Sequence, residues 1–342
     1  MIWLAPMPVA GLAHLVDWKT IAALAGLMVL SRGLEVSGLI DRAGRLVLAR
    51  LRSPRGLAVA LVLFAAGLSA VVTNDVALFV TVPLTLGLAR RVVLPVGRLV
   101  IFQALAVNAG SALTPVGNPQ NLYLWQVSGA GFVEFALAML PISAAMLALV
   151  LVPLGFGADR LALTAEPSPL PLKRGLMTLS LAAYPVFLMA VNAGLAEAAA
   201  VLVLAVYALA FRPVLRGLDW GLLVVFVLMF VNLGLLGRIP TVGASVAAWM
   251  DGPMAAFALG AGLSQVMSNV PAAIFLAPFT EDWRALAWGV NAGGFGLAIG
   301  SLANLIALRL APFPGIWRAF HLWSLPMLAA SVLAGAVLLR LV

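Results

Sequence analysis

The chain contains no cysteine and very little charge. Of its 342 residues only 9% are Asp, Glu, Lys or Arg, and the two histidines are His14 and His321. Without cysteine there are no disulfides, thiolate metal sites or cysteine nucleophiles. The histidines lie far apart, near the ends of predicted spans, so no transition-metal site is expected. P-loop, nucleophile-elbow and Ser/His/Asp patterns are also missing, so the sequence predicts no enzyme, no cofactor and no ATP-driven pump.

Apolar residues make up 64% of the chain. Soluble domains carry about 25% charged residues, and this composition cannot supply a water-exposed surface. Lipid must therefore solvate most of the chain. The apolar runs are often near 20 residues long, which suits helices rather than the alternating strands of a barrel. The sequence predicts an all-α polytopic membrane protein.

The net charge of +8 comes almost entirely from arginine. Arginines of a membrane protein mark its cytoplasmic loops, and no basic stretch here is long or interleaved with aromatics, so nucleic-acid binding is not expected. Residues 1–16 lack the basic start of a signal peptide, and whether this short apolar segment crosses the membrane stays open. The preference for arginine over lysine is typical of a GC-rich bacterial source, which predicts a multi-pass protein of the bacterial cytoplasmic (inner) membrane.

Two parts of the sequence resemble each other. Residues 291–304 match 108–121 at one offset of 183, through the pairs Asn108/Asn291, Gly110/Gly293, Gly117/Gly300 and Asn121/Asn304. Residues 262–269 resemble 67–74 at an offset of 195, and Asp219-Trp220 repeats Asp17-Trp18 at 202. The three matches occur in the same order in both halves, and along the chain the offset falls from 202 through 195 to 183. This pattern indicates two homologous halves with small deletions in the second.

Charges indicate how the halves are oriented. Basic residues flank 56–89 on both sides, so both ends should be cytoplasmic. The segment is shorter than the roughly 40 residues that two crossings need, so it should enter the membrane and return as a hairpin. Residues 253–280 have acidic flanks, and that hairpin should enter from the outside. Hairpins that enter from opposite sides are what inverted repeats require.

These signals predict a domain plan. Repeat 1 covers 17–156, a cytoplasmic linker covers 157–174, and 175–342 holds two leading spans followed by repeat 2. Each repeat should contain a re-entrant hairpin and a broken transmembrane helix, at 56–89 with 98–127, and at 253–280 with 285–311.

The broken helices should carry the chemistry. Pro115 and Pro119 lack N–H donors and disfavour helix in the preceding residue, so the run from Thr114 cannot continue as a helix. At membrane depth such backbone is tolerated only inside protein or beside a water-filled cavity. Freed carbonyls can bind a small cation, and half-helix N-termini can bind an anion. A kinked helix whose polar groups pair with neighbouring helices stays open as the alternative.

Two sets of candidate site residues follow. The predicted substrate-binding residues are Thr73, Asn74, Thr114, Asn118, Ser268, Asn269, Ser301 and Asn304. The predicted coupling-ion residues, which could hold Na⁺, are Asn74, Asp75, Asn108, Gly117, Asn121 and Asn291. An ionisable side chain near the membrane centre is usually functional, so Asp75 could ligate Na⁺ or carry a proton. A structural carboxylate bonded to the hairpin backbone is the other interpretation of Asp75.

The paired motifs resemble a known group. The tips read Thr73-Asn74-Asp75 and Ser268-Asn269-Val270, and the breaks read Gly117-Asn118-Pro119-Gln120-Asn121 and Gly300-Ser301-Leu302-Ala303-Asn304. Over about 17–311 this pattern resembles the ion transporter superfamily, which includes divalent anion/sodium symporters, citrate-transporter-like permeases and arsenite permeases. The citrate-transporter-like branch looks most similar. The second break lacks proline and the second tip ends in an apolar residue, which departs from the symporter pattern.

The resemblance implies two inverted repeats, a homodimer, and an elevator-type movement coupled to Na⁺ or H⁺. It implies a small anionic substrate, either a carboxylate or an inorganic oxyanion. The expected function is secondary active transport of such an anion. Arsenite efflux, Na⁺/H⁺ exchange and a passive anion channel stay open as alternatives.

Overall fold

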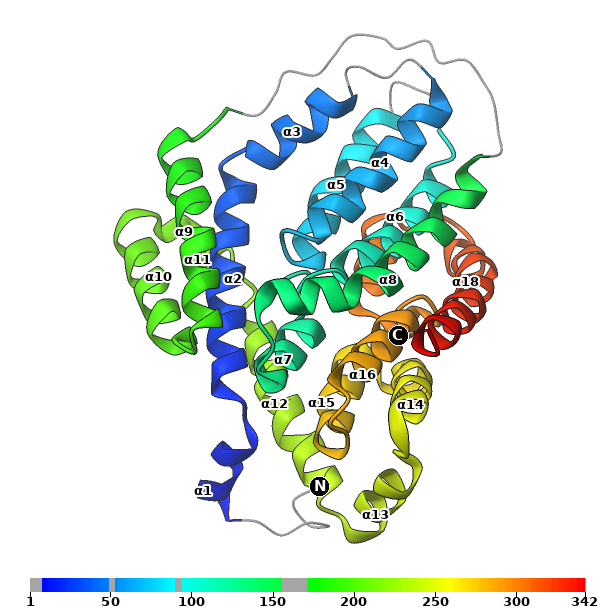
Figure 1. Cartoon of the computed structure of the whole chain (residues 1–342). Coiled ribbons are helices and arrows are strands. Elements are labelled where there is room, and N and C mark those ends of the chain that lie inside the picture. Colours follow the sequence, from blue (N-terminus) through cyan, green and yellow to red (C-terminus); the bar gives the residue numbers. More distant parts are fainter. Residues whose placement is uncertain (1–7, 49–52, 90–93, 156–170, 342) are drawn as a thin grey trace.

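The computed structural model of the chain describes residues 8–48, 53–89, 94–155 and 171–341 (Figure 1). All regular structure in these ranges is helical, and the prediction of an all-α polytopic membrane protein is confirmed. Of the N-terminal segment, residues 9–15 form the short helix α1 (Val9–Leu12) and one 3₁₀ turn. Most of the predicted linker lies outside the described residues, and its last residue, Arg174, already begins a helix.

The helices occur in the same order twice. The first series is α2 (Trp18–Val36), α3 (Leu39–Leu48), α4 (Pro54–Ser69), α5 (Asn74–Ala89), α6 (Val96–Ser111), α7 (Pro119–Ser128) and α8 (Phe132–Leu151). The second is α12 (Trp220–Gly237), α13 (Pro240–Trp249), α14 (Gly252–Met267), α15 (Asn269–Leu276), α16 (Trp283–Gly293), α17 (Leu302–Leu310) and α18 (Ile316–Leu339). Between them lie α9 (Arg174–Asn192), α10 (Ala196–Ala210) and α11 (Arg212–Arg216).

Each series contains a helical hairpin followed by an interrupted helix. The hairpins are α4–α5 and α14–α15, and the interrupted helices are α6–α7 and α16–α17. In Figure 1 the first hairpin opens toward the upper edge, beside α3, and the second toward the lower edge, beside α13. Opposite openings suit inverted repeats, and the inverted symmetry itself stays a prediction.

Helix lengths separate spanning segments from the hairpins. Within the described ranges four stretches are long and apolar enough to cross a membrane: Phe132–Leu154, Arg174–Asn192, Trp220–Gly237 and Ile316–Leu339. The pair α2 and α3, bent by 58°, makes up to a fifth. The 16-residue arms α4 and α5 are about 24 Å long, less than a hydrocarbon core of about 30 Å.

Side chains fix the start of several helices. The carboxylate of Asp17 accepts a hydrogen bond from the Thr20 amide, and Asp219 accepts one from the Leu222 amide. Both residues are therefore N-caps. Near the other end of α2, Arg32 and Glu35 form an ion pair at 2.6 Å.

Each hairpin packs tightly against the first part of the following interrupted helix. A Cβ added at Gly110 of α6 would collide with the backbone carbonyl of Ala66 in α4. In the second half, a Cβ at Gly289 of α16 would collide with the carbonyl of Phe257 in α14. Ser69 strengthens the first contact by donating to the carbonyl of Val107 at 3.0 Å. Small residues at these crossings allow backbones to approach, as is usual between membrane helices.

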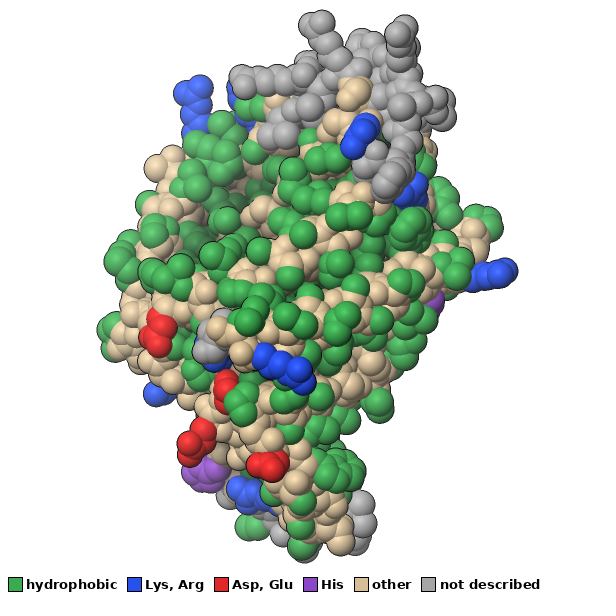
Figure 2. Space-filling model, turned by 45° about the vertical axis from the view of Figure 1, so that its right-hand side comes forward, with side chains coloured by type: hydrophobic (Ala, Val, Ile, Leu, Met, Phe, Trp, Pro, Cys, Tyr) green, Lys and Arg blue, Asp and Glu red, His purple; other side chains and the backbone are tan. Residues whose placement is uncertain are grey.

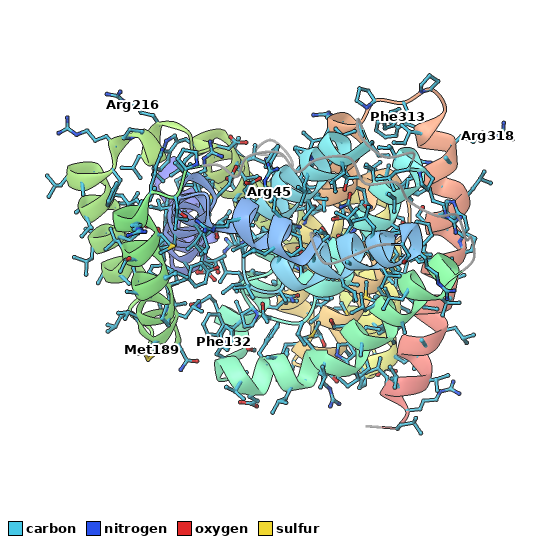
Figure 3. The ribbon with its side chains drawn as sticks, turned by 90° about the horizontal axis from the view of Figure 1, so that it is seen from above. Arg45, Phe132, Met189, Arg216, Phe313 and Arg318 are labelled. Atoms are coloured by element: carbon cyan, nitrogen blue, oxygen red, sulfur yellow. The ribbon has the colours of Figure 1, made fainter. Side chains whose placement is uncertain are left out.

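The helices form two groups. A side bundle contains α2, α9, α10 and α11, and a central bundle contains α4–α8 and α14–α18. Helix α12 packs on both α2 and α15, and we count it with the side bundle because of its contact with α2. Seen from above, α9 and α10 lie to one side, with Met189 and Arg216 on that edge and Arg318 at the opposite edge (Figure 3). Hydrophobic side chains cover most of the face shown in Figure 2. The two bundles meet mainly where α2 and α12 contact α5, α7 and α15.

Replacing Gly110 by alanine should destabilise the protein by about 1–3 kcal/mol, because the backbones must separate. The matched control is Gly67→Ala in α4, where an added Cβ meets nothing within 4 Å. That change should stabilise by up to about 1 kcal/mol through helix propensity. Thermal unfolding in detergent measures both variants. Equal midpoints would contradict the close packing of α4 on α6.

Candidate functional site

The two hairpin tips face the same pocket. A cavity of about 30 Å³ is lined by Thr73, Asn74 and Asp75 of the first tip and by Asn269 and Val270 of the second. These residues are separated by nearly 200 positions in the sequence. The first tip is fixed to the first break, because the Asn74 amide donates to the Gly117 carbonyl at 2.9 Å. Thr114 also donates to the Ala70 carbonyl at 2.7 Å.

Four helices begin at this pocket. Asn74 is the first residue of α5, Pro119 of α7, Asn269 of α15 and Leu302 of α17, and all four line the cavity. The N-terminus of a helix carries a partial positive charge of about half a unit. At three of these ends a first-turn amide is paired within the protein: Asn74 with the Gly117 carbonyl, Asn121 with Oδ1 of Asn118, and Ala303 with Oγ of Ser301. The convergence arises because each half contributes one arm of a hairpin and the second part of a broken helix. Together the four ends make the cavity electrostatically favourable for an anion.

Asp75 is the one ionisable residue among those that line the pocket. Asp75, in the first turn of α5, is partly buried and forms no ion pair with the described residues, and no Lys, Arg or His lines the cavity. Positive potential in the pocket therefore comes from backbone dipoles. At the second tip no side chain caps α15, so the amides of Asn269 and Val270 have no side-chain acceptor there, and Pro271 has no N–H.

The opposite wall of the pocket is apolar. Leu24 and Met28 come from α2, and Leu222 and Phe226 come from α12, so this wall belongs to the side bundle. All the polar lining residues belong to the central bundle. A ligand in the cavity would therefore be held by one bundle and would lie against a smooth hydrophobic surface of the other.

Beside the pocket lies a buried network of asparagines that joins the two breaks. Asn291 donates to Oδ1 of Asn121 at 2.7 Å and accepts from Nδ2 of Asn118 at 3.0 Å. Asn108 donates to Oδ1 of Asn304 at 2.8 Å. These side chains are at most 3% exposed. A hydrogen bond between buried side chains is costly to leave unmade, so the network holds the two halves in one register.

The same side chains satisfy backbone freed at the breaks. Nδ2 of Asn121 donates to the carbonyls of Ala112 at 2.9 Å and Thr114 at 3.1 Å. The Gly294 carbonyl accepts from Nδ2 of Asn304 at 2.9 Å and of Asn108 at 3.2 Å. Ser301 donates to Oδ1 of Asn108 at 2.8 Å. The carbonyls of Ala112, Thr114 and Gly294 thus have protein partners in this conformation, so they are not free to bind a cation.

The structure divides the predicted site residues into two sets. Thr73, Asn74, Asp75 and Asn269 line the pocket. Of the others, Gly117 and Thr114 bind the first tip, Ser268 lies between α14 and α15, and a final group forms the network: Asn108, Asn118, Asn121, Asn291, Ser301 and Asn304. Their roles in binding stay a prediction.

One expectation about the first break is corrected. The irregular stretch ends at Asn118, and Pro119 is already the first residue of α7. Proline suits this position because its missing N–H would have no helical partner there. Asn118 caps the helix by accepting from the Asn121 amide at 2.9 Å. The break is therefore shorter than the run of polar residues suggested.

Several lining residues escaped the sequence analysis. Leu24, Met28, Leu222 and Phe226 are indistinguishable from other apolar residues of a span, so no sequence signal could have identified them. Leu302 directly follows Ser301 in the second break, so its place in the sequence could have identified it as a lining residue.

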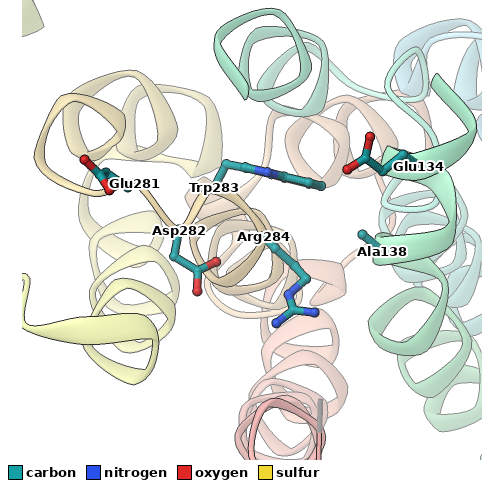
Figure 4. A pocket seen from close by; sticks show the side chains of 6 residues that line it. All are labelled: Glu134, Ala138, Glu281, Asp282, Trp283 and Arg284. Carbon is teal, nitrogen blue, oxygen red and sulfur yellow. The ribbon is translucent and has the colours of Figure 1, made fainter. Parts of the chain in front are cut away.

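A second, larger hollow of about 520 Å³ is formed by Glu134, Ala138, Glu281, Asp282, Trp283 and Arg284 (Figure 4). Two of its carboxylates cap helices: Asp282 accepts from the Ala285 amide, and Glu134 from the Gly131 amide. Across the described ranges no group of three or more His, Asp or Glu residues is placed to hold a metal ion. This hollow therefore has weaker support as a binding site than the pocket between the tips.

Spanning helices, a polar pocket between two bundles and the similarities below identify a polytopic membrane transporter rather than an enzyme. The chain belongs to the citrate transporter family (CitMHS), whose model matches residues 1–282. It is 44% identical to the inner membrane protein YbiR of Escherichia coli, over 95% of this chain and 88% of that protein.

More distant relatives are also transporters. Identity to the uncharacterized transporter MJ0456 of Methanocaldococcus jannaschii is 33%, over 87% of this chain and 82% of that protein. The silicon efflux transporter LSI3 of rice is 33% identical over 126 residues, which are 37% of this chain and 26% of that protein.

Replacing Asn291 by alanine should lower the free energy of unfolding by about 1–3 kcal/mol, because Oδ1 of Asn121 and Nδ2 of Asn118 lose a buried partner. Asn232→Ala is the control, since its exposed side chain bonds only within α12 and the change should stay within about 0.5 kcal/mol. Thermal unfolding without added substrate or sodium tests this. An unchanged midpoint for the Asn291 variant would favour an open ion ligand over a structural role.

Proposed function

We propose that this protein is a secondary active transporter of a small anion, a carboxylate or an inorganic oxyanion, coupled to Na⁺ or H⁺. The observation that carries the proposal is the convergence of four helix N-termini on one pocket without a basic side chain. Backbone amides bind an anion without the strong, localised attraction of an arginine. Weak but directional binding suits a transporter, which must release its substrate on the other side.

An elevator-type movement fits the division of the pocket. The polar residues lie on the central bundle and the apolar wall on the side bundle, so sliding would carry the substrate without breaking polar contacts to the wall. The cavity of about 30 Å³ holds roughly two water molecules, so its walls must separate before a polyatomic anion enters. Movement between the bundles or at the tips would provide that space.

Asp75 is the best-supported coupling group. It is the only ionisable residue among those that line the described pocket. A carboxylate without a basic partner attracts a cation, either a proton or Na⁺. Neutralising Asp75 would strengthen the positive field of the helix ends, so cation and anion would bind more tightly together than separately.

A second candidate function is efflux of a small neutral hydroxy compound. Arsenite, which is neutral as arsenous acid, is the example that the family resemblance suggests. The absence of a basic side chain from the described pocket favours it, and one partial relative is named a silicon efflux transporter. Na⁺/H⁺ exchange and a passive anion channel have no comparable support from the pocket. For the anion transporter we infer a homodimer in a bacterial cytoplasmic membrane, in line with the family resemblance and with an inner membrane relative.

Ligand-induced stabilisation distinguishes the two candidates. A panel of small carboxylates, inorganic oxyanions and neutral hydroxides is screened for an increase in the unfolding temperature, with and without Na⁺ and at two pH values. A bound ligand at 100 times its Kd adds about 2.7 kcal/mol. An anion should stabilise the native protein, and Asn269→Ala should abolish that effect while Asn232→Ala keeps it. Stabilisation by neutral hydroxides alone would replace the anion proposal with the second candidate.

Asp75→Asn tests the coupling. The variant should bind the anion, because the amide mimics the neutral acid, but uptake into proteoliposomes should no longer respond to the gradient of the coupling cation. Wild-type uptake is measured with an imposed pH gradient, with an imposed Na⁺ gradient and with neither. An Asp75→Asn variant that follows the same gradient as the wild type would remove Asp75 from coupling.

A further inference from the structure

The tip of the first hairpin is held by a tyrosine of the other bundle. Tyr184, on α9, donates from its hydroxyl to the Val71 carbonyl at 2.7 Å. Its side chain is only 7% exposed, and it reaches the tip from a helix that otherwise packs on α2 and α10. Val71 lies two residues before Thr73 and three before Asn74, which both line the pocket. The bond therefore connects the side bundle directly to the pocket residues.

A second hydroxyl, on Ser31, also lies close to the Tyr184 phenol. Ser31 on α2 is fully buried, its Oγ has no partner of standard geometry, and it interacts with the Tyr184 phenol. A buried hydroxyl without a partner is costly. Ser31 belongs to the same bundle as Tyr184, so movement of the central bundle would leave this pair together.

A neighbouring pair shows what the released state would look like. Tyr207 of α10 and Ser180 of α9 lie 2.6 Å apart in a hydrogen bond inside the side bundle. Both pairs join a tyrosine to a serine on an adjacent helix of the same bundle. The difference is that Tyr184 donates its hydroxyl proton to the Val71 carbonyl, which lies outside the side bundle.

We propose that Tyr184 is a two-position latch: its hydroxyl holds Val71 in this conformation and moves to Ser31 when the first hairpin leaves the side bundle. One hydrogen bond of the phenol replaces another, so neither state leaves the buried phenol unpaired. Tyr184 is a positioning residue, since it acts on the pocket through the tip. Its part in transport rests on the proposed function, whereas the exchange of hydrogen-bond partners does not.

A second contact from α9 must also break when the bundles separate. Oδ1 of Asn192 accepts from the Phe132 amide at the start of α8, at 2.9 Å. Asn192 is eight residues after Tyr184, about 12 Å along the helix. This bond is exposed, so water can replace it at little cost, and the buried Tyr184 bond is the one that holds the conformation.

Amide hydrogen exchange at residues 72–77, in the intact protein in nanodiscs, tests the latch without a known substrate. These amides include bonds of Asn74 to Gly117 and of Ala77 to Thr73. Tyr184→Phe keeps the ring but removes the donor, and should speed their exchange about two- to tenfold. Residues 269–272 at the other tip should not change. Tyr207→Phe, which removes a tyrosine hydroxyl inside the side bundle, should leave residues 72–77 unaffected.

Ser31→Ala gives the decisive result, because its effect has the opposite sign. Removal of the alternative partner should slow exchange at residues 72–77 by a similar factor. In a Tyr184→Phe background, Ser31→Ala should have no further effect, since the shared hydroxyl is absent. Faster or unchanged exchange in Ser31→Ala alone would overturn the latch, and this holds even if Tyr184→Phe does not fold. If the latch holds but the uptake assay fails, only the proposed function is wrong.

Discussion

The structure depends on one requirement: backbone groups freed inside a membrane must find partners within the protein. The chain interrupts two helices and turns two hairpins among buried apolar helices, which would leave carbonyls and amides unpaired. Buried asparagines supply the missing partners at the breaks, and Asn121 alone binds the carbonyls of Ala112 and Thr114. Because the carbonyls are satisfied, the helix N-termini at the breaks stay fixed in position. Their convergence on the pocket is a consequence of this arrangement.

The two bundles contribute different kinds of residue to the pocket. The central bundle supplies every polar lining group, and the side bundle supplies an apolar wall from α2 and α12. A surface without hydrogen-bonding groups offers little resistance to sliding, while the asparagine network keeps the two halves of the central bundle together. If the bundles slide as we propose, the few polar links between them, such as that from Tyr184 to Val71, would strongly influence which conformation is populated.

The sequence predicted the parts of this architecture that need special residues. Glycine and asparagine at matching places in two apolar regions, with proline added in the first break, indicated the tips and breaks, because this combination disfavours a continuous helix. It could not separate ligands from structural partners, since Asn291 and Asn269 look alike until their neighbours are known. The apolar wall and Tyr184 were also beyond prediction, because leucine, phenylalanine or tyrosine in a span carries no mark of what lies opposite. The short helices α3 and α13 were missed since each is only ten residues long.

The most direct test of the account is an experimental density map of the protein in a lipid nanodisc with a saturating concentration of an anion that stabilises it. The account predicts density for the anion between the first turns of α5, α7, α15 and α17, in contact with Asn74 and Asn269. Density at the hollow near Arg284, with the pocket between the tips empty, would contradict it.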